Sequence, residues 1–386
     1  MKVGIVGLGY RLAYLARVFS AERADFQVVG HVDPAPAGLP YARQHGIAVG
    51  THYPSLEAML DAEQLDLLMV GSPNHLHLGH IRTGLERGLK VFTEKPVVVT
   101  VEETMEIASL IARYGSDNLM VGLVLRYAPL YRDLRQAQAD GLLGDIASIE
   151  ASEHIPPYHG AFFMRDWRRY ERYSGSFMLE KCCHDLDLYN GVIGCRPKSV
   201  VSFGGRKIFT PEHAPQARGV NDLEVYHRKP SGWEGTDQVF DSDGDIIDFQ
   251  TAMVEYENGA VLSFHTNLSV PDDFRRFAVI GHKGQAEGDF VRNYFKVTDS
   301  HTSERLIDRT YTVNDLSAHY GADEQMARDI CRHLVDGAPL PVSVVDALEA
   351  GLLALTMDEA RRARSVIDMT RTWQRFDAAL AGQGSA

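Results

Sequence analysis

The first 122 residues alternate short apolar runs with amphipathic helical patterns, and this order constrains the fold more than any other feature of the sequence. Each apolar run has the length of a strand, and the stretches between the runs carry helical periodicity. A chain that alternates in this way forms a parallel sheet with helices on both faces. The predicted strands are Lys2–Val6, Gln27–Val32, Leu65–Val70, Lys90–Thr93 and Leu119–Val124.

The pattern changes after residue 122. One long helical pattern, Pro129–Ala139, precedes stretches that alternate in twos, which is typical of antiparallel sheets with one buried face. Asn258-Gly259 predicts a tight hairpin, because both residues tolerate positive φ. We therefore expect an α/β chain in which residues 1–122 form a doubly wound parallel sheet domain. Residues 123–386 should form an α+β domain with an open, mainly antiparallel sheet.

Other local signals complete the expected organisation. A capping-box pattern that begins at Thr100 predicts a helix start. The stretch Pro211–Asp245 is polar and rich in Gly and Asp, so we expect loops there. Lys283-Gly284 predicts a second chain reversal, Val344–Arg364 the last helix, and residues 381–386 a frayed end.

Composition limits the function. With 39 basic and 52 acidic residues, the formal charge is −13, which disfavours nucleic acid and anionic membranes as partners. No apolar run reaches the roughly 18 residues of a membrane-spanning helix. Four cysteines are too few for a disulfide scaffold, so we expect reduced thiols. These features are typical of a cytoplasmic protein that acts on small molecules.

A glycine pair follows the first predicted strand. Gly7 and Gly9 precede a helical pattern that opens with Tyr10 and Arg11. Glycine at such a turn lets the backbone approach a pyrophosphate at the helix N-terminus. Leu12 replaces the third glycine of the usual fingerprint, and an ordinary tight turn would also explain the pair. The position nevertheless favours a dinucleotide site.

Asp33 ends the second predicted strand, where a carboxylate can accept hydrogen bonds from a ribose hydroxyl. Its charge would repel the extra phosphate of NADP, so NAD is the expected cofactor. The alternative is a turn residue ahead of Pro34.

Two further polar segments, 72–77 and Glu94-Lys95-Pro96, lie at the carboxyl ends of predicted strands. Ligands of doubly wound sheets bind at this edge. Proline after Lys95 restricts the lysine backbone to extended conformations, which would hold its side chain at the strand end. Each segment alone could be an ordinary polar loop, but their order along the chain favours a site.

A dense ionisable segment lies in the second half. At 100° per residue, Glu180, Lys181, His184 and Asp187 share one helix face, and apolar residues share the other. Periodicity alone favours a solvated charged face, but such a group also suits general acid-base chemistry. A zinc site at Cys182, Cys183 and His184 is disfavoured, because neighbouring helical cysteines point apart and no second cysteine pair exists. We predict no metal.

Together these motifs resemble the Gfo/Idh/MocA family, which includes glucose-fructose oxidoreductase, inositol dehydrogenase and a rhizopine catabolism protein. The resemblance covers essentially the whole chain, and Glu94-Lys95-Pro96 is its most specific element. It implies a Rossmann domain that binds NAD and a catalytic lysine, Lys95, that also touches the nicotinamide ribose. The predicted cofactor residues are Gly7, Gly9, Tyr10, Arg11, Asp33, Ser72, Asn74, His77, Glu94 and Lys95.

The family also carries a glycine-rich stretch followed by Asp-x-x-x-His. Glu180 and His184 occupy these positions here, with Glu in place of Asp and only Gly175 left of the glycine run. The resemblance implies that His184 accepts a hydroxyl proton, Lys95 hydrogen-bonds the developing alkoxide and Glu180 fixes a neighbouring hydroxyl. The expected reaction is NAD-dependent oxidation of a secondary hydroxyl of a sugar, sugar derivative or cyclitol.

Aromatic rings and charged side chains commonly hold sugars. The candidates for substrate binding are Arg126, His154, Tyr158, Trp167, Arg168 and Lys181. Four arginines crowd residues 165–172. They form either a solvated loop or subunit contact, or a site for an anionic substituent such as a carboxylate, phosphate or sulfonate.

Two other functions stay open. Some relatives in this family are NAD-dependent glycosidases, which use transient oxidation at C3, elimination and water addition, and Glu180, Lys181 and Asp185 offer additional ionisable groups for such a reaction. A nucleotide sensor without turnover is disfavoured, because Lys95 and His184 are both present. We also expect, chiefly by resemblance, a homodimer or homotetramer formed through an exposed sheet face.

Overall fold

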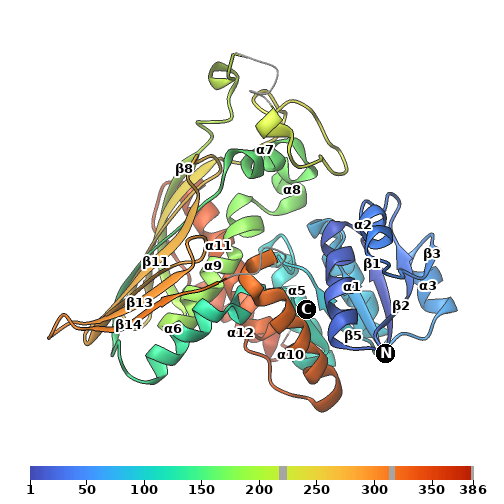
Figure 1. Ribbon diagram of the computed structural model, residues 1–386, viewed down its shortest axis with the longest axis horizontal. Coiled ribbons are helices and arrows are strands. Elements are labelled where there is room, and N and C mark those ends of the chain that lie inside the picture. Colours follow the sequence, from blue (N-terminus) through green and yellow to red (C-terminus); the bar gives the residue numbers. More distant parts are fainter. Residues whose placement is uncertain (217–223, 313–317, 384–386) are drawn as a thin grey trace. The chain divides into compact units, whose positions relative to one another are not determined.

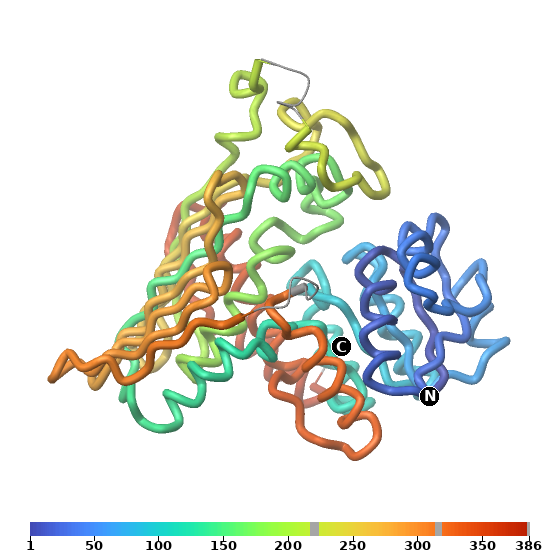
Figure 2. Tube along the Cα trace, in the orientation of Figure 1, coloured from blue at the N-terminus to red at the C-terminus, as the bar shows by residue number. Residues whose placement is uncertain are grey.

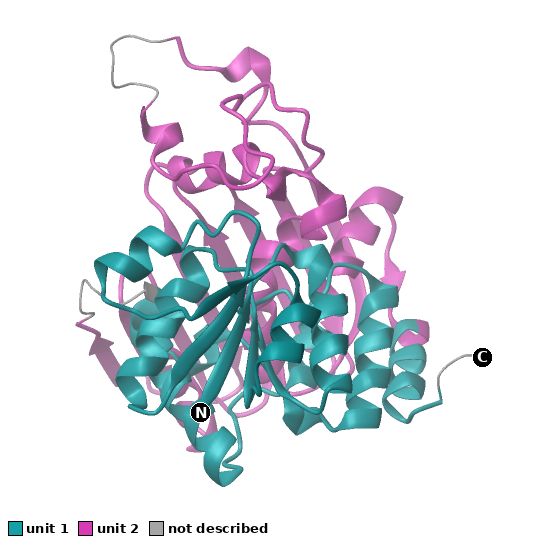
Figure 3. Ribbon diagram, turned by 90° about the vertical axis from the view of Figure 1, so that its right-hand side faces the viewer, with its two compact units in different colours: residues 1–128, 314–351, 372–386 teal, residues 129–313, 352–371 magenta. Residues whose placement is uncertain are grey.

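The computed structural model describes residues 1–216, 224–312 and 318–383. The chain forms two compact units, which Figure 3 colours separately. Unit 1 contains residues 1–128 with the described parts of 314–351 and 372–386, and unit 2 contains residues 129–313 and 352–371. These units differ from the expected domains, 1–122 and 123–386, because C-terminal segments pack with the N-terminal sheet unit.

Unit 1 is built on a six-stranded parallel sheet in the order β3-β2-β1-β4-β5-β6, which confirms the doubly wound fold. Five of the strands were predicted, and β3 was missed because its three residues form no apolar run. The strands are β1 (Lys2–Val6), β2 (Gln27–Val32), β3 (Thr51–Tyr53), β4 (Leu67–Val70), β5 (Lys90–Thr93) and β6 (Leu119–Val121).

Helices connect these strands, and the start of one of them has the cap that the sequence predicts. Thr100 Oγ1 accepts from Glu103 N at 3.1 Å, and Glu103 Oε2 accepts from Val99 N at 2.9 Å, so the predicted capping box is confirmed. The helices of unit 1 are α1 (Tyr10–Glu22), α2 (Leu39–Gln44), α3 (Leu56–Ala62), α4 (His77–Glu86), α5 (Val101–Tyr114), α10 (Ala322–Asp336), the first part of α11 (Val344–Ala363) and most of α12 (Thr370–Leu380).

Unit 2 contains a nine-stranded sheet in the order β14-β13-β12-β11-β7-β10-β9-β8-β15. Its neighbouring strands are antiparallel except for the parallel pair β7–β10, so the predicted open, mainly antiparallel sheet is confirmed. The strands are β7 (Ile146–His154), β8 (Pro197–Gly205), β9 (Phe249–Tyr256), β10 (Val261–Asn267), β11 (Phe274–Gly281), β12 (Gly284–Asp289), β13 (Tyr294–Asp299), β14 (Arg305–Thr310) and β15 (Ile367–Asp368).

Both predicted chain reversals of this sheet are present. Asn258-Gly259 joins β9 to β10, with Gly259 at φ 83°, and Lys283 lies in the turn between β11 and β12. The helices of unit 2 are α6 (Pro129–Ala139), α7 (Pro157–Arg165), α8 (Glu171–Ser174) and α9 (Phe177–Ile193), with the second part of α11. Figure 1 shows α9 along one face of the sheet.

Two other expectations have different outcomes. In its described residues, the predicted loop Pro211–Asp245 contains only short 3-10 turns at Pro211–His213 and Glu224–His227, and Figure 2 traces it as an irregular yellow-green path. The predicted last helix corresponds to α11, but it is not the last, because α12 follows β15. Within the described residues, no helix is both long and apolar enough to cross a membrane.

The start of α9 has a strained backbone. Ser176 caps the helix by accepting from Leu179 N at 3.1 Å, and its φ is 147°. Glycine adopts such a φ without cost, whereas other residues do so at a cost of about 1–3 kcal/mol. Ser176 therefore adopts, just before α9, a backbone conformation that is usual for glycine.

Candidate active site

The two glycines of the turn between β1 and α1 have different surroundings. Gly7 has φ 84°, and a Cβ there would lie 2.2 Å from the backbone nitrogen of Ser72. Gly9 has a φ of −77°, and a Cβ there would meet no atom within 4 Å. The open space at Gly9 adjoins the N–H groups at the N-terminus of α1, so it fits a pyrophosphate.

Arg11 forms salt bridges with two carboxylates of unit 1. Its Nε lies 2.8 Å from Glu94 Oε1, and its NH1 lies 2.8 Å from Asp323 Oδ1. Burial disfavours the guanidinium charge, but the two carboxylates outweigh burial and raise the pKa of Arg11 above its usual value. Arg11 thus ties the Glu94-Lys95-Pro96 segment to α1. Asp323 could not be predicted as a partner of Arg11, because more than 300 residues separate the two.

Asp33 lies at the carboxyl end of β2, as predicted. Its Oδ1 accepts from Ala35 N at 2.7 Å, so the carboxylate also stabilises the turn after the strand. The predicted turn role and a ribose-binding role are therefore compatible. Tyr10, the first residue of α1, is 64% exposed and packs edge-on against Tyr41.

His77 connects the two loops that follow β4 and β5. Its Nδ1 lies 2.9 Å from Pro96 O, and its Nε2 lies 2.8 Å from Ser72 O. The side chain is 1% exposed, so His77 braces the loops that carry Ser72 and Lys95 instead of facing solvent. Asn74 is also buried, Lys95 is half-buried, and the Lys95–Pro96 peptide bond is cis.

Arg126, a predicted substrate residue, is buried in unit 1. Its guanidinium lies 3.4 Å from Pro341 O and 3.8 Å from Asp346 Oδ1. Pro341 precedes α11 and Asp346 lies in its first turn, and both belong to unit 1. These two partners of Arg126 therefore lie in its own unit.

Helix α9 carries Glu180 and His184 one turn apart, and each is 4% exposed. Asp185 and Asp187 on the same helix are also buried. The alternative of a solvated charged face is therefore wrong. A buried helix with this many ionisable groups requires partners for them, because unpaired charges are costly to bury.

Strands β7 and β11 supply the partners of Lys181 and Asp185. Lys181 Nζ lies 2.7 Å from Glu153 Oε1, and Arg275 binds Asp185 in a bidentate pair at 2.8 and 2.6 Å. Arg275 also lies 3.0 Å from Glu153 Oε2. Lys181, predicted as a substrate contact, is thus paired inside unit 2, and its neighbours Glu153 and Arg275 were not among the predicted site residues.

Burial and charge act oppositely on the two carboxyls of this cluster. Burial alone would raise the pKa of Glu153, but Arg275 and Lys181 lower it to about 2. Burial raises the pKa of Asp185 to about 7, although Arg275 opposes this. Ligand atoms of Glu153, Cys182 and Asp185 lie within 4.8 Å of one another. The two adjacent cations already neutralise these carboxylates, so the cluster is poorly suited to a metal ion.

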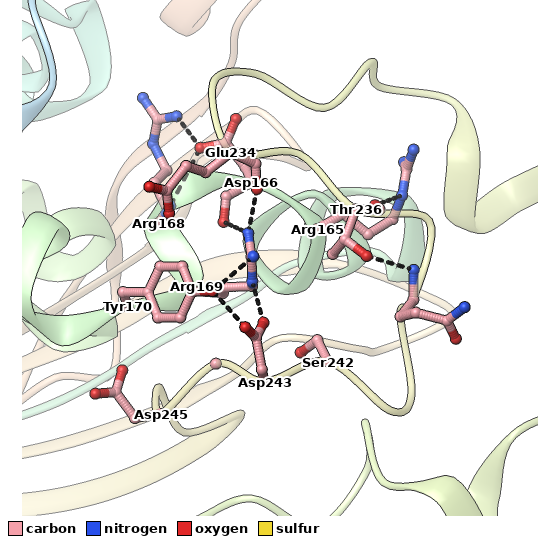
Figure 4. A network of polar contacts seen from close by, with 12 residues as sticks. Arg165, Asp166, Arg168, Arg169, Tyr170, Glu234, Thr236, Ser242, Asp243 and Asp245 are labelled. Atoms are coloured by element: carbon pink, nitrogen blue, oxygen red, sulfur yellow. Dashed lines mark hydrogen bonds and ion pairs between the residues drawn. The ribbon is translucent and has the colours of Figure 1, made fainter.

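The arginine-rich segment 165–172 has partners within unit 2 (Figure 4). Arg165 donates to the carbonyl oxygens of Tyr226 and Lys229 at 3.1 and 3.0 Å. Arg169 Nε lies 2.8 Å from Asp243 Oδ1. Both arginines therefore hold the loop between β8 and β9. Arg168 instead bridges Asp166 and Glu180.

The remaining predicted substrate residues, His154, Tyr158 and Trp167, lie on β7, on α7 and in the 3-10 turn Trp167–Arg169. Glu153 faces α9, so His154, the next residue of β7, lies on the opposite face, where its ring contacts His265 and Phe274. Tyr158 lies on α7 near the Arg228 and Lys229 side chains. Trp167 is 6% exposed beneath Arg168.

Two family models match the chain. One, described as an oxidoreductase family with an NAD-binding Rossmann fold (GFO_IDH_MocA), matches residues 1–123. The other, the GFO/IDH/MocA C-terminal domain, matches residues 131–287. Together they cover most of the chain.

Curated relatives carry several activities. The 1,5-anhydro-D-fructose reductase of Ensifer adhaerens is 28% identical over 257 residues, which are 66% of this chain and 65% of that protein. The rhizopine catabolism protein MocA of Rhizobium meliloti is 23% identical over 63% of this chain and 76% of that protein. The 2,7-anhydro-N-acetylneuraminate hydratase of Escherichia coli (strain K12) is 24% identical over 52% of each. The chain thus spans from about half to three quarters of the length of these relatives.

Solved structures resemble this chain over almost all of its length. A levoglucosan dehydrogenase in complex with NADH and levoglucosan has a TM-score of 0.76 at 17% identity, over 96% of this chain and 99% of that chain. The myo-inositol 2-dehydrogenase of Lactobacillus plantarum has a TM-score of 0.73 at 18% identity, over 95% and 99%. At these identities the similarity shows that this chain shares their fold, and no more.

Proposed function

This chain belongs to the Gfo/Idh/MocA oxidoreductase family and has an NAD-binding Rossmann domain, and on that premise we propose that it is an NAD-dependent dehydrogenase. The proposed substrate is a sugar, sugar derivative or cyclitol with a secondary hydroxyl. Relatives named 1,5-anhydro-D-fructose reductase and inositol 2-dehydrogenase support this class. The observation that carries the proposal is the burial of Glu180 and His184 one turn apart on α9.

Each residue has a defined role in the proposed reaction. Bound NAD supplies the hydride acceptor. His184 takes the proton of the reacting hydroxyl as general base. Lys95 donates a hydrogen bond to the oxygen as negative charge develops there, and Glu180 accepts a hydrogen bond from a neighbouring hydroxyl.

We propose an uncharged substrate. The sequence left open an anionic substituent bound by Arg168 and Lys181, but both cations lie within 2.9 Å of carboxylates of the chain itself. Any anionic group would have to compete with these carboxylates, which are held in place, whereas hydroxyl groups need no counter-charge.

An assay panel tests the function directly. The protein is incubated with NAD and polyols, free sugars, sugar acids and nitrophenyl glycosides, while NADH absorbance and nitrophenol release are followed. A dehydrogenase accumulates NADH in proportion to an uncharged polyol or sugar. Greater activity with the acids than with their neutral analogues would contradict the uncharged substrate.

The second candidate is an NAD-dependent glycosidase. A relative named a hydratase supports it, because that name denotes water addition without net oxidation. Nitrophenol release that requires NAD but accumulates no NADH would favour this reaction over dehydrogenation. The proposed additional acid-base groups, Lys181 and Asp185, are engaged in ion pairs, which favours the dehydrogenase.

Cofactor preference provides a separate prediction. Replacing Asp33 with serine should lower the ratio of kcat/KM for NAD to that for NADP roughly 10- to 100-fold, because hydrogen bonds to a charged group contribute about 1.5–3 kcal/mol. Asp61→Ser, at an exposed carboxylate of α3, is the matched control. An unchanged ratio in Asp33→Ser would leave Asp33 with its turn role alone.

Assembly and location are also proposals. Phe203 and Met253 are 63% and 53% exposed, and the β8–β9 register places them on the sheet face opposite the buried side chains. This supports a homodimer or homotetramer, which light scattering measures. The four free cysteines support a cytoplasmic location, which cell fractionation tests.

A further inference from the structure

Arg168 connects two buried carboxylates next to α9. Its Nε lies 2.8 Å from Glu180 Oε1, and its NH1 lies 2.9 Å from Asp166 Oδ1. Glu180 and Asp166 are 4% and 1% exposed. A single guanidinium therefore neutralises part of the charge of two carboxylates that water barely reaches.

The Arg168 guanidinium also lies over two aromatic rings. Its central carbon lies 4.2 Å from the centre of the Trp167 ring and 5.2 Å from that of Phe162. Burial disfavours the charge, but Asp166 and Glu180 outweigh it and raise the pKa of Arg168 above its usual value. The aromatic rings and the charge-assisted hydrogen bonds together hold this side chain between Asp166 and Glu180.

Asp166 is fixed from its other side by the loop between β8 and β9. Its Oδ2 accepts from Gly232 N at 2.8 Å, and a Cβ at position 232 would lie 2.5 Å from the same oxygen. Its Oδ1 also accepts from Arg168 N at 3.2 Å. The loop thus orients Asp166, Asp166 orients Arg168, and Arg168 contacts Glu180.

The neighbouring arginines do not share this arrangement. Arg165 and Arg169 bind the loop, as described above, and Arg172 stacks on Tyr170 and Tyr173 at 4.3 and 4.7 Å. Of the four arginines in 165–172, Arg168 is the one whose ion pair reaches α9.

We propose that Arg168 is the positioning residue for Glu180, with Asp166 and Gly232 as its support. Arg168 fixes one oxygen of the Glu180 carboxylate and keeps the group ionised, so that it can accept a hydrogen bond from a substrate hydroxyl. The inference rests on the substrate-binding role proposed for Glu180. It assigns to Arg168 a role inside the protein in place of the anion-binding role that the sequence left open.

A double-mutant cycle on the full-length protein tests this role. Arg168→Gln should lower kcat/KM about 10- to 100-fold, the contribution expected of a charge-assisted hydrogen bond. In a Glu180→Gln background, the same replacement should lower kcat/KM less than about threefold, because Arg168 acts through Glu180. If Arg168→Gln lowered kcat/KM by the same factor in wild type and in Glu180→Gln, the proposal would be overturned.

Two further variants separate positioning from a general structural role. Arg168→Lys keeps the charge but cannot bridge two carboxylates with a planar fork, so its activity should lie between those of wild type and Arg168→Gln. Arg172→Gln, which removes another arginine of the same segment, should leave kcat/KM unchanged.

A spectroscopic measurement decides the inference independently of turnover. With Trp233 and Trp373 replaced by Phe, Trp167 is the sole tryptophan of the three in the chain. Glu180→Gln should then shift its emission, because Arg168 over the indole loses one partner. Glu171→Gln, which affects Arg361 and Arg362, should not. An emission unchanged by Glu180→Gln refutes the pairing, whereas a protein that shows the shift but oxidises no panel substrate refutes the proposed function alone.

Discussion

Turnover should fall about 10²- to 10⁴-fold when His184 is replaced by alanine, because a positioned general base contributes about that factor. His184 lies on buried α9, one turn from Glu180, where a base would be shielded from bulk water. The measurement is kcat with the best substrate of the panel. His265→Ala is the control, because His265 lies on β10 opposite the core-facing Phe264 and Thr266.

Lys95→Ala should have a loss of the same order. The residue follows β5, in a loop that His77 braces through Pro96 O at 2.9 Å. Lys90→Ala is the matched control, since Lys90 begins the same strand at its other end, where its Nζ donates to Asp117 O. If both His184→Ala and Lys95→Ala kept wild-type turnover while NAD still bound, the assigned catalytic roles would be wrong.

The largest effect on stability is expected at Arg275. Replacing it with methionine leaves Asp185 without its bidentate partner and removes one of the two cations beside Glu153. Breaking a buried ion pair by removing one partner costs about 3–5 kcal/mol of the free energy of unfolding. Urea unfolding followed by circular dichroism, at about pH 8 where Asp185 is ionised in the wild-type chain, measures this loss.

The adjacent residue of β11 is the control for this measurement. Arg276 lies on the opposite face, is paired with Glu150 at 3.8 Å and has a side chain that is 54% exposed. Arg276→Gln should change the free energy of unfolding by no more than about 0.5 kcal/mol. Equal losses at the two arginines would show that the buried pair does not stabilise unit 2.

The same cluster predicts a pH dependence. The pKa of Asp185 is about 7 in the folded chain, because of burial, against an ordinary value of 3.8. At pH values between these two pKa values, Asp185 is more protonated in the folded chain than in the unfolded chain. Its contribution to the free energy of unfolding therefore falls as pH rises from about 4 to about 7. Asp185→Asn should remove that slope. Glu153, with its pKa lowered to about 2, acts in the opposite sense below about pH 4.5.

Most of the fold was predictable because its signals are local. The strands Lys2–Val6, Gln27–Val32 and Lys90–Thr93 and the helix Pro129–Ala139 have the predicted bounds, since apolar periodicity depends on neighbours along the chain. The membership of α10 in unit 1 was not predictable. Its packing against α1 joins segments that are some 300 residues apart.

Part of the candidate site is encoded locally. Successive residues of β7 alternate between the two faces of the sheet, which places His154 on the face of Ser148 and Glu150, and Glu153 on the other face. Ile149 and Ala151 are buried, so the core side was readable from the sequence. The partner of Glu153 was not, because Arg275 lies on a distant strand.

The sequence by itself determined the parallel sheet, the glycine turn, the polar strand ends and the helix that carries Glu180 and His184, because each depends on residues a few positions apart. Only the tertiary structure decided what the charged side chains do. Arg11, Arg168 and Lys181 are candidate ligand contacts by residue type, yet each is paired with carboxylates of the chain. The physical reason is desolvation: a charge buried by packing must find its partner among the elements packed against it, and sequence order does not specify those elements.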